Sequence, residues 1–333
     1  MKTFKALRIH EVDKGTDARL ESICLGDLSV GGVVVRIAYS CINYKDALAV
    51  TGRGKIMRGY PKVAGIDLSG TVENCESDTF KPGDPVLVTG CNIGEVLDGG
   101  LAEYARLPAE AVIPLPAGLT LREAMALGTA GFTAALGVRR MLENHQKPEM
   151  GTIAVTGPTG GVGSVAISIL NQLGFKVAAV TGKKAAAQDY LTALGAGEVI
   201  DRAEVDYGKR PLEKAIWGGA IDTLGGDTLT WLTRTTRQWG NIASIGLAQS
   251  HKLDTTVMPF ILRGISLLGI NSVEVPRAWR EAVWQDLAGS WKPERLNDRI
   301  ASRTVSLEQV PEVCAALIEG DELGRTVVEI GGG

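Results

Sequence analysis

The feature that most constrains the fold is a glycine-rich turn between two apolar segments. Residues 152–157 (TIAVTG) form a short β-branched run, whereas residues 162–174 (VGSVAISILNQLG) have helical spacing. Between them Gly157, Gly160 and Gly163 recur at every third position. Glycines let such a turn tighten, let backbone N–H groups approach a pyrophosphate and let the helix pack close to the sheet. We predict a phosphate-binding turn; a structural turn is the alternative, since the spacing is GxxGxxG rather than GxGxxG.

The segments that follow continue the alternation of strand and helix. A helix is predicted at 185–196, and further strands are predicted at 176–182, 198–201, 220–226, 240–247 and 265–271. Strands and helices that alternate through short turns predict a parallel, doubly wound α/β sheet. The uncharged stretch 150–175 is long enough to cross a membrane, but the turn at its centre interrupts it. We therefore predict no membrane span.

The first 125 residues or so are β-rich instead. Short runs bounded by Gly, Pro and Asp lie at 33–42, 64–75, 84–90 and 101–108, which predicts a barrel-like or sheet-rich unit. Residues 119–143 have helical spacing, with a break expected at Gly128 and Gly131. The final sixty residues contain helical stretches at 276–291 and 307–320 and then a strand, RTVVEIGG.

The end of the second strand of the α/β unit predicts which cofactor is bound. An NAD site usually has an acidic residue about 20 residues after the glycines, where it holds the ribose 2′-hydroxyl. Here the segment is Thr181-Gly182-Lys183-Lys184, and no acidic residue occurs before Asp189. Two lysines and a hydroxyl suit a 2′-phosphate, so we predict NADPH; a solvated lysine pair is the alternative.

Composition excludes several classes of protein. The formal net charge is −3, which gives no sign of a nucleic-acid-binding surface. The five cysteines are odd in number and form no CxxC pair, which argues for a reducing compartment, and we expect the cytoplasm. His10, His145 and His251 lie far apart, and neither they nor the cysteines have zinc-site spacing. We predict no metal.

Several segments together carry a more specific resemblance. They are NYKDALAVTGRGKI (43–56), GIDLSGTV (65–72), GTAGFTA (128–134), VTGPTGGVGS (155–164), AIDTLGG (220–226) and TTVMPFILRGISLLGINSV (255–273). On these the whole chain resembles the zinc-independent medium-chain dehydrogenases/reductases, in the acryloyl-CoA reductase branch, which is quinone oxidoreductase-like. Where zinc alcohol dehydrogenases have a ligand Cys and a ligand His, this chain has Asn43 and Ile66.

The resemblance implies a fold, an activity and an assembly. It implies a Rossmann cofactor domain at 128–271 and a GroES-like catalytic domain formed by 1–127 and 272–333. The implied activity is the NADPH-dependent reduction of acryloyl-CoA to propanoyl-CoA, and a homodimer is implied. Together with the glycine turn it places the cofactor contacts at Tyr44, Gly157, Thr159, Gly160, Gly161, Val162, Gly163, Thr181, Gly182, Lys183, Lys184, Arg202, Leu247, Ile261, Asn271, Ser272 and Arg325.

Reduction of an enoyl thioester defines what the catalytic residues must do. Negative charge develops on the thioester oxygen, which needs hydrogen-bond donors, and the α-carbon takes a proton. Asn43, Tyr44 and Lys45 offer three donors on a predicted loop. We expect Tyr44 near the nicotinamide and Lys45 or Asn43 near the carbonyl. A structural pair of Lys45 with Asp46 or Asp67 is the alternative.

A local basic segment suggests where coenzyme A binds. Residues 45–62 contain five Lys and Arg and one acidic residue, Asp46. Arg53, Lys55 and Arg58 are candidates to hold the 3′-phosphate or pyrophosphate, although a solvated loop would look the same. Two other functions stay open: the same machinery acting on quinones, enones or enals, and a non-enzymatic NADPH-binding protein.

Overall fold

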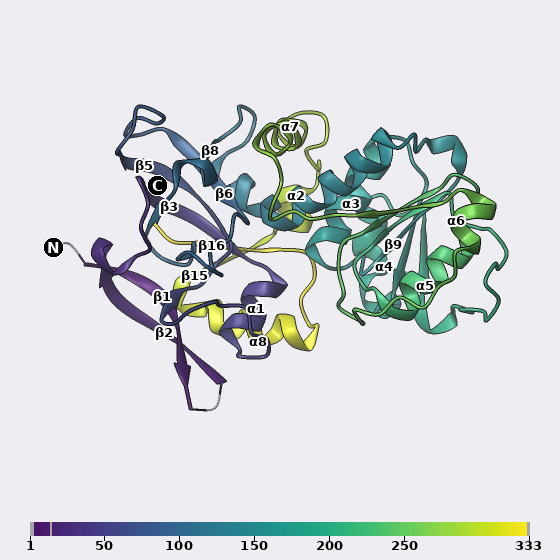
Figure 1. Ribbon diagram of the computed structural model, residues 1–333, viewed down its shortest axis with the longest axis horizontal. Coiled ribbons are helices and arrows are strands. Elements are labelled where there is room, and N and C mark those ends of the chain that lie inside the picture. The colour runs from purple at the N-terminus through teal and green to yellow at the C-terminus, as the bar shows by residue number, and fades with distance from the viewer. Residues whose placement is uncertain (1–2, 14, 332–333) are drawn as a thin grey trace. The chain divides into compact units, whose positions relative to one another are not determined.

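The structure is a computed structural model that describes residues 3–13 and 15–331, and it divides into two compact units (Figure 1). The first comprises residues 1–129, 273–288 and 296–333, and the second comprises residues 130–272 and 289–295. The boundaries at 129 and 272 lie within two residues of those expected from the sequence, and residues 289–295 belong to the second unit. No helix in the described part of the chain has the length and apolar character needed to span a membrane.

The second unit is built on one six-stranded parallel sheet, in the order β11-β10-β9-β12-β13-β14. Its strands are β9 (Ile153–Thr156), β10 (Val177–Thr181), β11 (Glu198–Asp201), β12 (Gly219–Asp222), β13 (Asn241–Ser244) and β14 (Ser266–Gly269). Counted along the chain this order is 3-2-1-4-5-6, the doubly wound arrangement that binds dinucleotides. The prediction of a Rossmann-type sheet is confirmed.

Helices connect these strands in the expected places. They are α3 (Gly161–Gln172), α4 (Lys184–Ala193), α5 (Gly226–Thr235) and α6 (Met258–Arg263). Helix α3 packs on β9 and β10, and α5 packs on β13. Residues of β9, β10 and β12 that face the core, such as Ala154, Val180 and Ala220, are fully buried or nearly so. Apolar runs without polar alternation are therefore explained, because such a sheet is covered on both faces.

The first unit contains a seven-stranded and a three-stranded sheet. The larger follows the order β15-β16-β3-β5-β6-β8, with β7 paired to β3, and the smaller follows β2-β1-β4. The strands are β1 (Thr3–Val12), β2 (Gly15–Cys24), β3 (Val33–Ile42), β4 (Lys62–Val63), β5 (Asp67–Cys75), β6 (Pro85–Thr89), β7 (Tyr104–Leu107), β8 (Ile113–Pro114), β15 (Arg303–Ser306) and β16 (Thr326–Glu329). The prediction of a β-rich unit is confirmed, although the β1–β2 hairpin was not predicted strand by strand.

Helices complete this unit. They are α1 (Tyr44–Val50), α7 (Arg277–Ala288) and α8 (Val310–Glu319), together with α2 (Leu121–Glu143), which runs on into the second unit. Short single-turn helices lie at Leu25–Asp27, Ala109–Ala111, Pro148–Met150, Arg202–Glu204, Leu296–Ile300 and Leu307–Gln309. The break in α2 lies at Gly128, whose φ is 52°. Gly131, the second glycine expected to mark it, lies within the helix.

Helix α1 corrects the expectation of a loop after Asn43. Asn43 has extended backbone angles and caps the helix, and the Asp46 carboxylate accepts the Asn43 backbone N–H. This reciprocal arrangement is a capping box. Helix α1 packs against α8, and Ala47, Val50 and Val313 belong to one buried cluster. Seven residues are too few for helical periodicity to be recognised, so the capping pair is the available sequence signal.

Candidate functional site

The glycine turn of the second unit brings backbone segments closer together than a side chain would allow. Gly157 has φ of 57°, and a Cβ there would lie 2.2 Å from Thr223 Oγ1. A Cβ on Gly163 would lie 2.5 Å from the Gly157 carbonyl oxygen. Helix α3 begins at Gly161, directly after the turn. The turn thus presents bare backbone at a helix N-terminus, as a pyrophosphate requires.

Hydrogen bonds of polar side chains stabilise this turn, and the sequence did not predict them. The Thr156 hydroxyl donates to the buried Asp222 carboxylate over 2.7 Å, and the Gly225 N–H donates to its other oxygen over 2.8 Å. On the far side of the turn, Tyr190 donates to the Ser164 hydroxyl over 2.8 Å. Burial raises the pKa of Tyr190 to about 12, so it stays a donor at neutral pH.

Next to the turn lies a pocket of about 300 Å³ in which many of the predicted cofactor residues meet. Its lining residues are Gly157, Thr159, Val180, Thr181, Gly182, Lys183, Arg202 and Leu224. Gly182 leaves room for the Arg202 guanidinium, which would lie 3.3 Å from a Cβ at that position. Lys183 and Arg202 therefore place two cations in one pocket beside the turn, the arrangement that a 2′-phosphate would need.

The other predicted cofactor residues do not line this pocket. Lys184 begins α4 and pairs with Glu204 over 3.8 Å. Leu247 and Ile261 are strongly exposed, and Asn271 and Ser272 follow β14. Gly160, Gly161, Val162 and Gly163 form the turn and the first residues of α3. Their contacts with the cofactor stay predictions.

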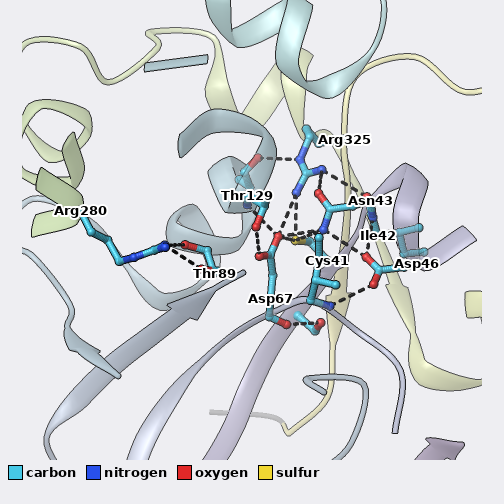
Figure 2. Close-up of polar contacts among 12 residues, drawn as sticks. Cys41, Ile42, Asn43, Asp46, Asp67, Thr89, Thr129, Arg280 and Arg325 are labelled. Atoms are coloured by element: carbon cyan, nitrogen blue, oxygen red, sulfur yellow. Dashed lines mark hydrogen bonds and ion pairs between the residues drawn. The ribbon is translucent and has the colours of Figure 1, made fainter. Parts of the chain in front are cut away.

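Asn43, one of the predicted catalytic residues, caps the N-terminus of α1 and lies among polar side chains of the first unit (Figure 2). Asn43 is buried, and its side-chain amide donates to Asp67 over 2.8 Å and to Asp46 over 3.1 Å. Its oxygen accepts from Arg325 over 2.8 Å. Both donors and the acceptor of the Asn43 side chain are thus engaged inside the protein. Asp46 also accepts from the Ile66 N–H over 2.9 Å.

The Asp67 carboxylate accepts four hydrogen bonds within this group, one of them from Asn43. Asp67 is fully buried, and its carboxylate accepts from the Thr129 N–H over 2.7 Å, the Thr129 hydroxyl over 2.5 Å and the Cys41 thiol over 3.1 Å. Desolvation raises the pKa of Cys41 well above its usual value, so the thiol keeps its proton and remains a donor. The prediction that Cys41 belongs to the core agrees with its complete burial.

Arg325 supplies the positive charge of the cluster. Arg325 is 5% exposed, and its guanidinium donates to Cys41, to Asn43 and to the carbonyl groups of Ile42 and Ala126. It also lies 4.0 Å from the Asp67 carboxylate. We call Cys41, Asn43, Asp46, Asp67, Thr129 and Arg325 the buried polar cluster. The structure thus places Arg325 beside Asn43, and the predicted contact of Arg325 with the cofactor stays a prediction.

Tyr44 and Lys45 lie on the outer side of the same helix end. Tyr44 is 48% exposed, which leaves its hydroxyl accessible. Lys45 forms an ion pair, as one reading of the sequence expected, but with Glu95 rather than Asp46 or Asp67. The Lys45 Nζ lies 2.7 Å from the Glu95 carboxylate. Glu95 lies 50 residues away in a turn, and nothing in its local sequence predicts this contact.

The candidate CoA residues are exposed side chains of one irregular segment after α1. Arg53 pairs with Glu319 over 3.1 Å at the surface. Lys55 and Arg58 are exposed, and the Arg58 backbone N–H donates to the Glu95 carbonyl. The structure thus places all three on one accessible segment of the first unit, and their role in binding CoA stays a prediction.

Comparison with known proteins identifies the family. Residues 29–117 match the alcohol dehydrogenase GroES-like domain, and residues 161–288 match the zinc-binding dehydrogenase domain. The protein YhfP of Bacillus subtilis, which is named as a quinone oxidoreductase, is 44% identical over 98% of this chain and 99% of its own. The chain belongs to the medium-chain dehydrogenase/reductase superfamily. The predicted family and its two-domain fold are confirmed.

Other members of this superfamily are similar over nearly their whole length. The acrylyl-CoA reductase AcuI of Ruegeria pomeroyi is 43% identical over 98% of this chain and 99% of its own. A crystal structure of the yhdH oxidoreductase from Salmonella enterica with NADP is 42% identical, with a TM-score of 0.95, over 98% of this chain and all of its own. The crystal structure of Bacillus subtilis yhfP with NAD bound is 43% identical, also with a TM-score of 0.95, over 99% of this chain and all of its own.

The zinc of some superfamily members does not fit this buried polar cluster. A metal ligand must offer a lone pair, but the Asp67 and Asn43 oxygens already accept hydrogen bonds. The Arg325 guanidinium lies 2.9 Å from Cys41 Sγ, so a second cation there would be repelled. In the described part of the chain, no three His, Cys, Asp or Glu side chains are grouped so that they could hold a metal ion.

Asp46 should give this protein a pH-dependent stability. Burial raises the pKa of Asp46 from 3.8 to about 7, so between these values the folded protein binds a proton that the unfolded chain does not. The free energy of unfolding then falls as the pH rises through this interval. Relative to Asp46→Asn, which cannot titrate, we expect a fall of roughly 1.4 kcal/mol per pH unit.

Urea unfolding of both proteins at several pH values between about 5 and 8 measures this difference. The acceptor that Asp46→Asn loses adds an offset that does not vary with pH, and titration of other groups cancels between the two proteins. A difference that is constant with pH would show that Asp46 is ionised throughout.

Proposed function

We propose that this protein reduces the activated C=C bond of acryloyl-CoA to give propanoyl-CoA, with NADPH as the hydride donor and without zinc. The observation that carries the cofactor assignment is the pocket in which Lys183 and Arg202 meet beside the glycine turn. The substrate assignment is supported by AcuI of Ruegeria pomeroyi and by AcuI of Escherichia coli, 42% identical, which is also named as an acrylyl-CoA reductase.

The residues present fit NADPH. The glycine turn and the start of α3 would hold the pyrophosphate, and Lys183 and Arg202 would hold the 2′-phosphate. Escherichia coli YhdH, 42% identical with a TM-score of 0.94, was solved with NADPH. NAD in the yhfP crystal shows that a relative of this similarity also accepts the dinucleotide without that phosphate. We therefore expect the preference to come from the two cations.

Removal of either cation should weaken the binding of NADPH and leave the binding of NADH nearly unchanged. In Lys183→Ala and Arg202→Ala we expect the KM for NADPH to rise roughly 10- to 100-fold, because each variant loses a charge-assisted contact to phosphate. The KM for NADH should change little. Steady-state kinetics with both cofactors measures this, and Lys176→Ala is a matched control, since that exposed lysine lies at the opposite end of β10. Equal losses for both cofactors would refute the assignment.

The residues of the first unit would stabilise the reacting thioester. NADPH, when bound, supplies the hydride that adds to the β-carbon. The Lys45 ammonium and Tyr44 hydroxyl are accessible donors on one helix end and would stabilise the charge on the thioester oxygen. We assign the carbonyl contact to Lys45 rather than Asn43, because both Asn43 amide hydrogens are already donated to carboxylates. The proton for the α-carbon is left without an assigned donor.

A substrate panel tests the activity. We expect NADPH oxidation with acryloyl-CoA to have a kcat/KM well above that with a small quinone, and to survive dialysis against a chelator. Reduction of quinones is the second candidate, and the name of YhfP, 44% identical, supports it equally. A kcat/KM that favours the quinone would refute our choice. Absence of turnover with any activated alkene or quinone would favour a non-enzymatic NADPH-binding protein.

The basic segment should act on the CoA part of the substrate alone. We expect the Arg53→Ala, Lys55→Ala, Arg58→Ala triple variant to raise the KM for acryloyl-CoA roughly 10-fold or more, because exposed cations attract phosphates. The effect should shrink at high salt. The KM for NADPH should be unchanged, and a small enone without CoA should be reduced as by the wild type. An unchanged KM for acryloyl-CoA would show that this segment does not bind CoA.

We also propose that the protein is a homodimer of the cytoplasm. Strand β14 ends the six-stranded sheet, and an open edge can pair with a second copy. In the same unit, Ile261 and Leu262 of helix α6 are 71% and 59% exposed, and Val257 at its N-cap is 67% exposed. Exposed apolar groups of this size favour association. Five free cysteines agree with a reducing compartment. The mass in solution tests the dimer.

A further inference from the structure

The buried polar cluster contains more hydrogen-bonded side chains than a helix cap requires. A capping box requires one side chain at Asn43 and one at Asp46. Here the Asn43 amide also joins Asp67 on β5 and Arg325 before β16. Asp67 and Arg325 are 24 and 282 residues from Asn43 along the chain. One amide group therefore ties the first turn of α1 to two distant parts of the unit.

Gly128 shows that the fold is shaped around this cluster. A Cβ at Gly128 would lie 2.4 Å from the Arg325 guanidinium, 2.7 Å from Asp67 Oδ2 and 2.8 Å from Cys41 Sγ. The left-handed conformation of Gly128, which interrupts α2, is what brings the Thr129 N–H onto Asp67. The break in the helix therefore supplies donors to the cluster and leaves space for it.

From this geometry we infer that Asn43 and Arg325 act as one positioning unit, in which the guanidinium supplies the positive charge of the cluster. The hydrogen bonds of Asn43 and Arg325 described above all join protein groups. The cluster fixes the N-terminus of α1, and thereby the direction of Tyr44 and Lys45, through the engaged Asn43 amide. Asn43 is thus a positioning residue, and the residues that contact the substrate are Tyr44 and Lys45. The role in catalysis rests on the proposed reductase activity.

Charge and hydrogen bonding explain why this pair of residues is used. Two buried carboxylates, those of Asp46 and Asp67, lie next to Asn43, and the Arg325 guanidinium lies 4.0 Å from Asp67. A buried carboxylate needs donors or an opposite charge, and Arg325 supplies the charge while Asn43 supplies donors to both carboxylates. An aspartate at position 43 would add a third carboxylate, and an alanine would leave Asp46 and Asp67 each short of a donor. Each residue therefore depends on the other.

The test compares Asn43→Ala, Arg325→Met and the double variant. We expect each single substitution to lower kcat roughly 10- to 100-fold, as misplaced catalytic groups do, with the KM values for NADPH and acryloyl-CoA within about threefold of wild type. The double variant should turn over within about threefold of the slower single variant, since residues that act as a unit are not additive. Losses that multiply, or a KM effect without a kcat effect, would overturn the inference.

Hydrogen exchange gives a readout that does not depend on the reaction. Amides in a peptide that spans residues 43–51 should exchange faster in Asn43→Ala and in Arg325→Met than in wild type. Ser69→Ala is the matched control, since Ser69 is also buried on β5 and donates to Leu121 over 2.7 Å outside the cluster. It should lower Tm without altering kcat or the exchange of α1.

The two proposals can fail separately. If the wild type reduces none of the panel substrates, the proposed activity fails, while exchange in α1 still decides whether Asn43 and Arg325 position that helix. Unchanged exchange in both variants overturns the positioning role whatever the activity. If Arg325→Met does not fold, Arg325→Lys keeps the charge, and one ammonium cannot reach Asn43, Ile42 and Ala126 together. We then expect the same pattern from Arg325→Lys, and wild-type values would overturn the inference.

Discussion

The carboxylate of Asp67 has no access to water, and much of the first unit is arranged to supply the donors it needs. A buried charge without partners costs several kcal/mol. Asp67 meets this requirement with donors from β3, from the cap of α1 and from Thr129 after the break in α2. These elements come from distant parts of the chain, so a single charge joins them. The apolar packing of α1 on α8 would not by itself fix the rotation of so short a helix.

The second unit solves a different problem with backbone rather than side chains. A pyrophosphate needs several N–H groups within a few ångströms, and any Cβ in the way would hold it off. Gly157 and Gly163 remove those atoms, and the buried Asp222 holds the neighbouring strand end through Thr156 and Gly225. The two units thus use opposite means: one excludes side chains to expose backbone donors, and the other fills its interior with side-chain donors.

Local patterns predicted most of the second unit. Its strands and helices alternate at short range, β9 and β10 are buried and largely apolar runs, and the glycine turn lies between β9 and α3. Lys183 could be assigned from its distance along the chain, and Arg202 from its place after the third strand. Both assignments use the regular geometry of a parallel sheet, in which the carboxyl ends of neighbouring strands meet at one edge. The pocket follows from that regularity.

The buried polar cluster could not be predicted in this way, because its partners are set by topology rather than spacing. Asn43 and Asp46 form a recognisable cap, but the contacts of Asn43 with Asp67 and Arg325 depend on how β3, β5 and β16 are ordered in the sheet. The sequence suggested Asn43 as a substrate contact because it is one of three hydrogen-bond donors, with Tyr44 and Lys45, on a predicted loop. The sequence did not show that both amide hydrogens of Asn43 would be donated to carboxylates of the protein.

Charge shows the same limit, since a count of charged residues does not show which of them remain available. Residues 45–62 have five cations and one acid, yet Lys45 is paired with Glu95 and Arg53 with Glu319. The Arg53 pair is exposed on both sides, and such pairs contribute little. A phosphate could therefore displace Glu319 at small cost. The Lys45 pair is more enclosed than the Arg53 pair, so it orients the ammonium more firmly.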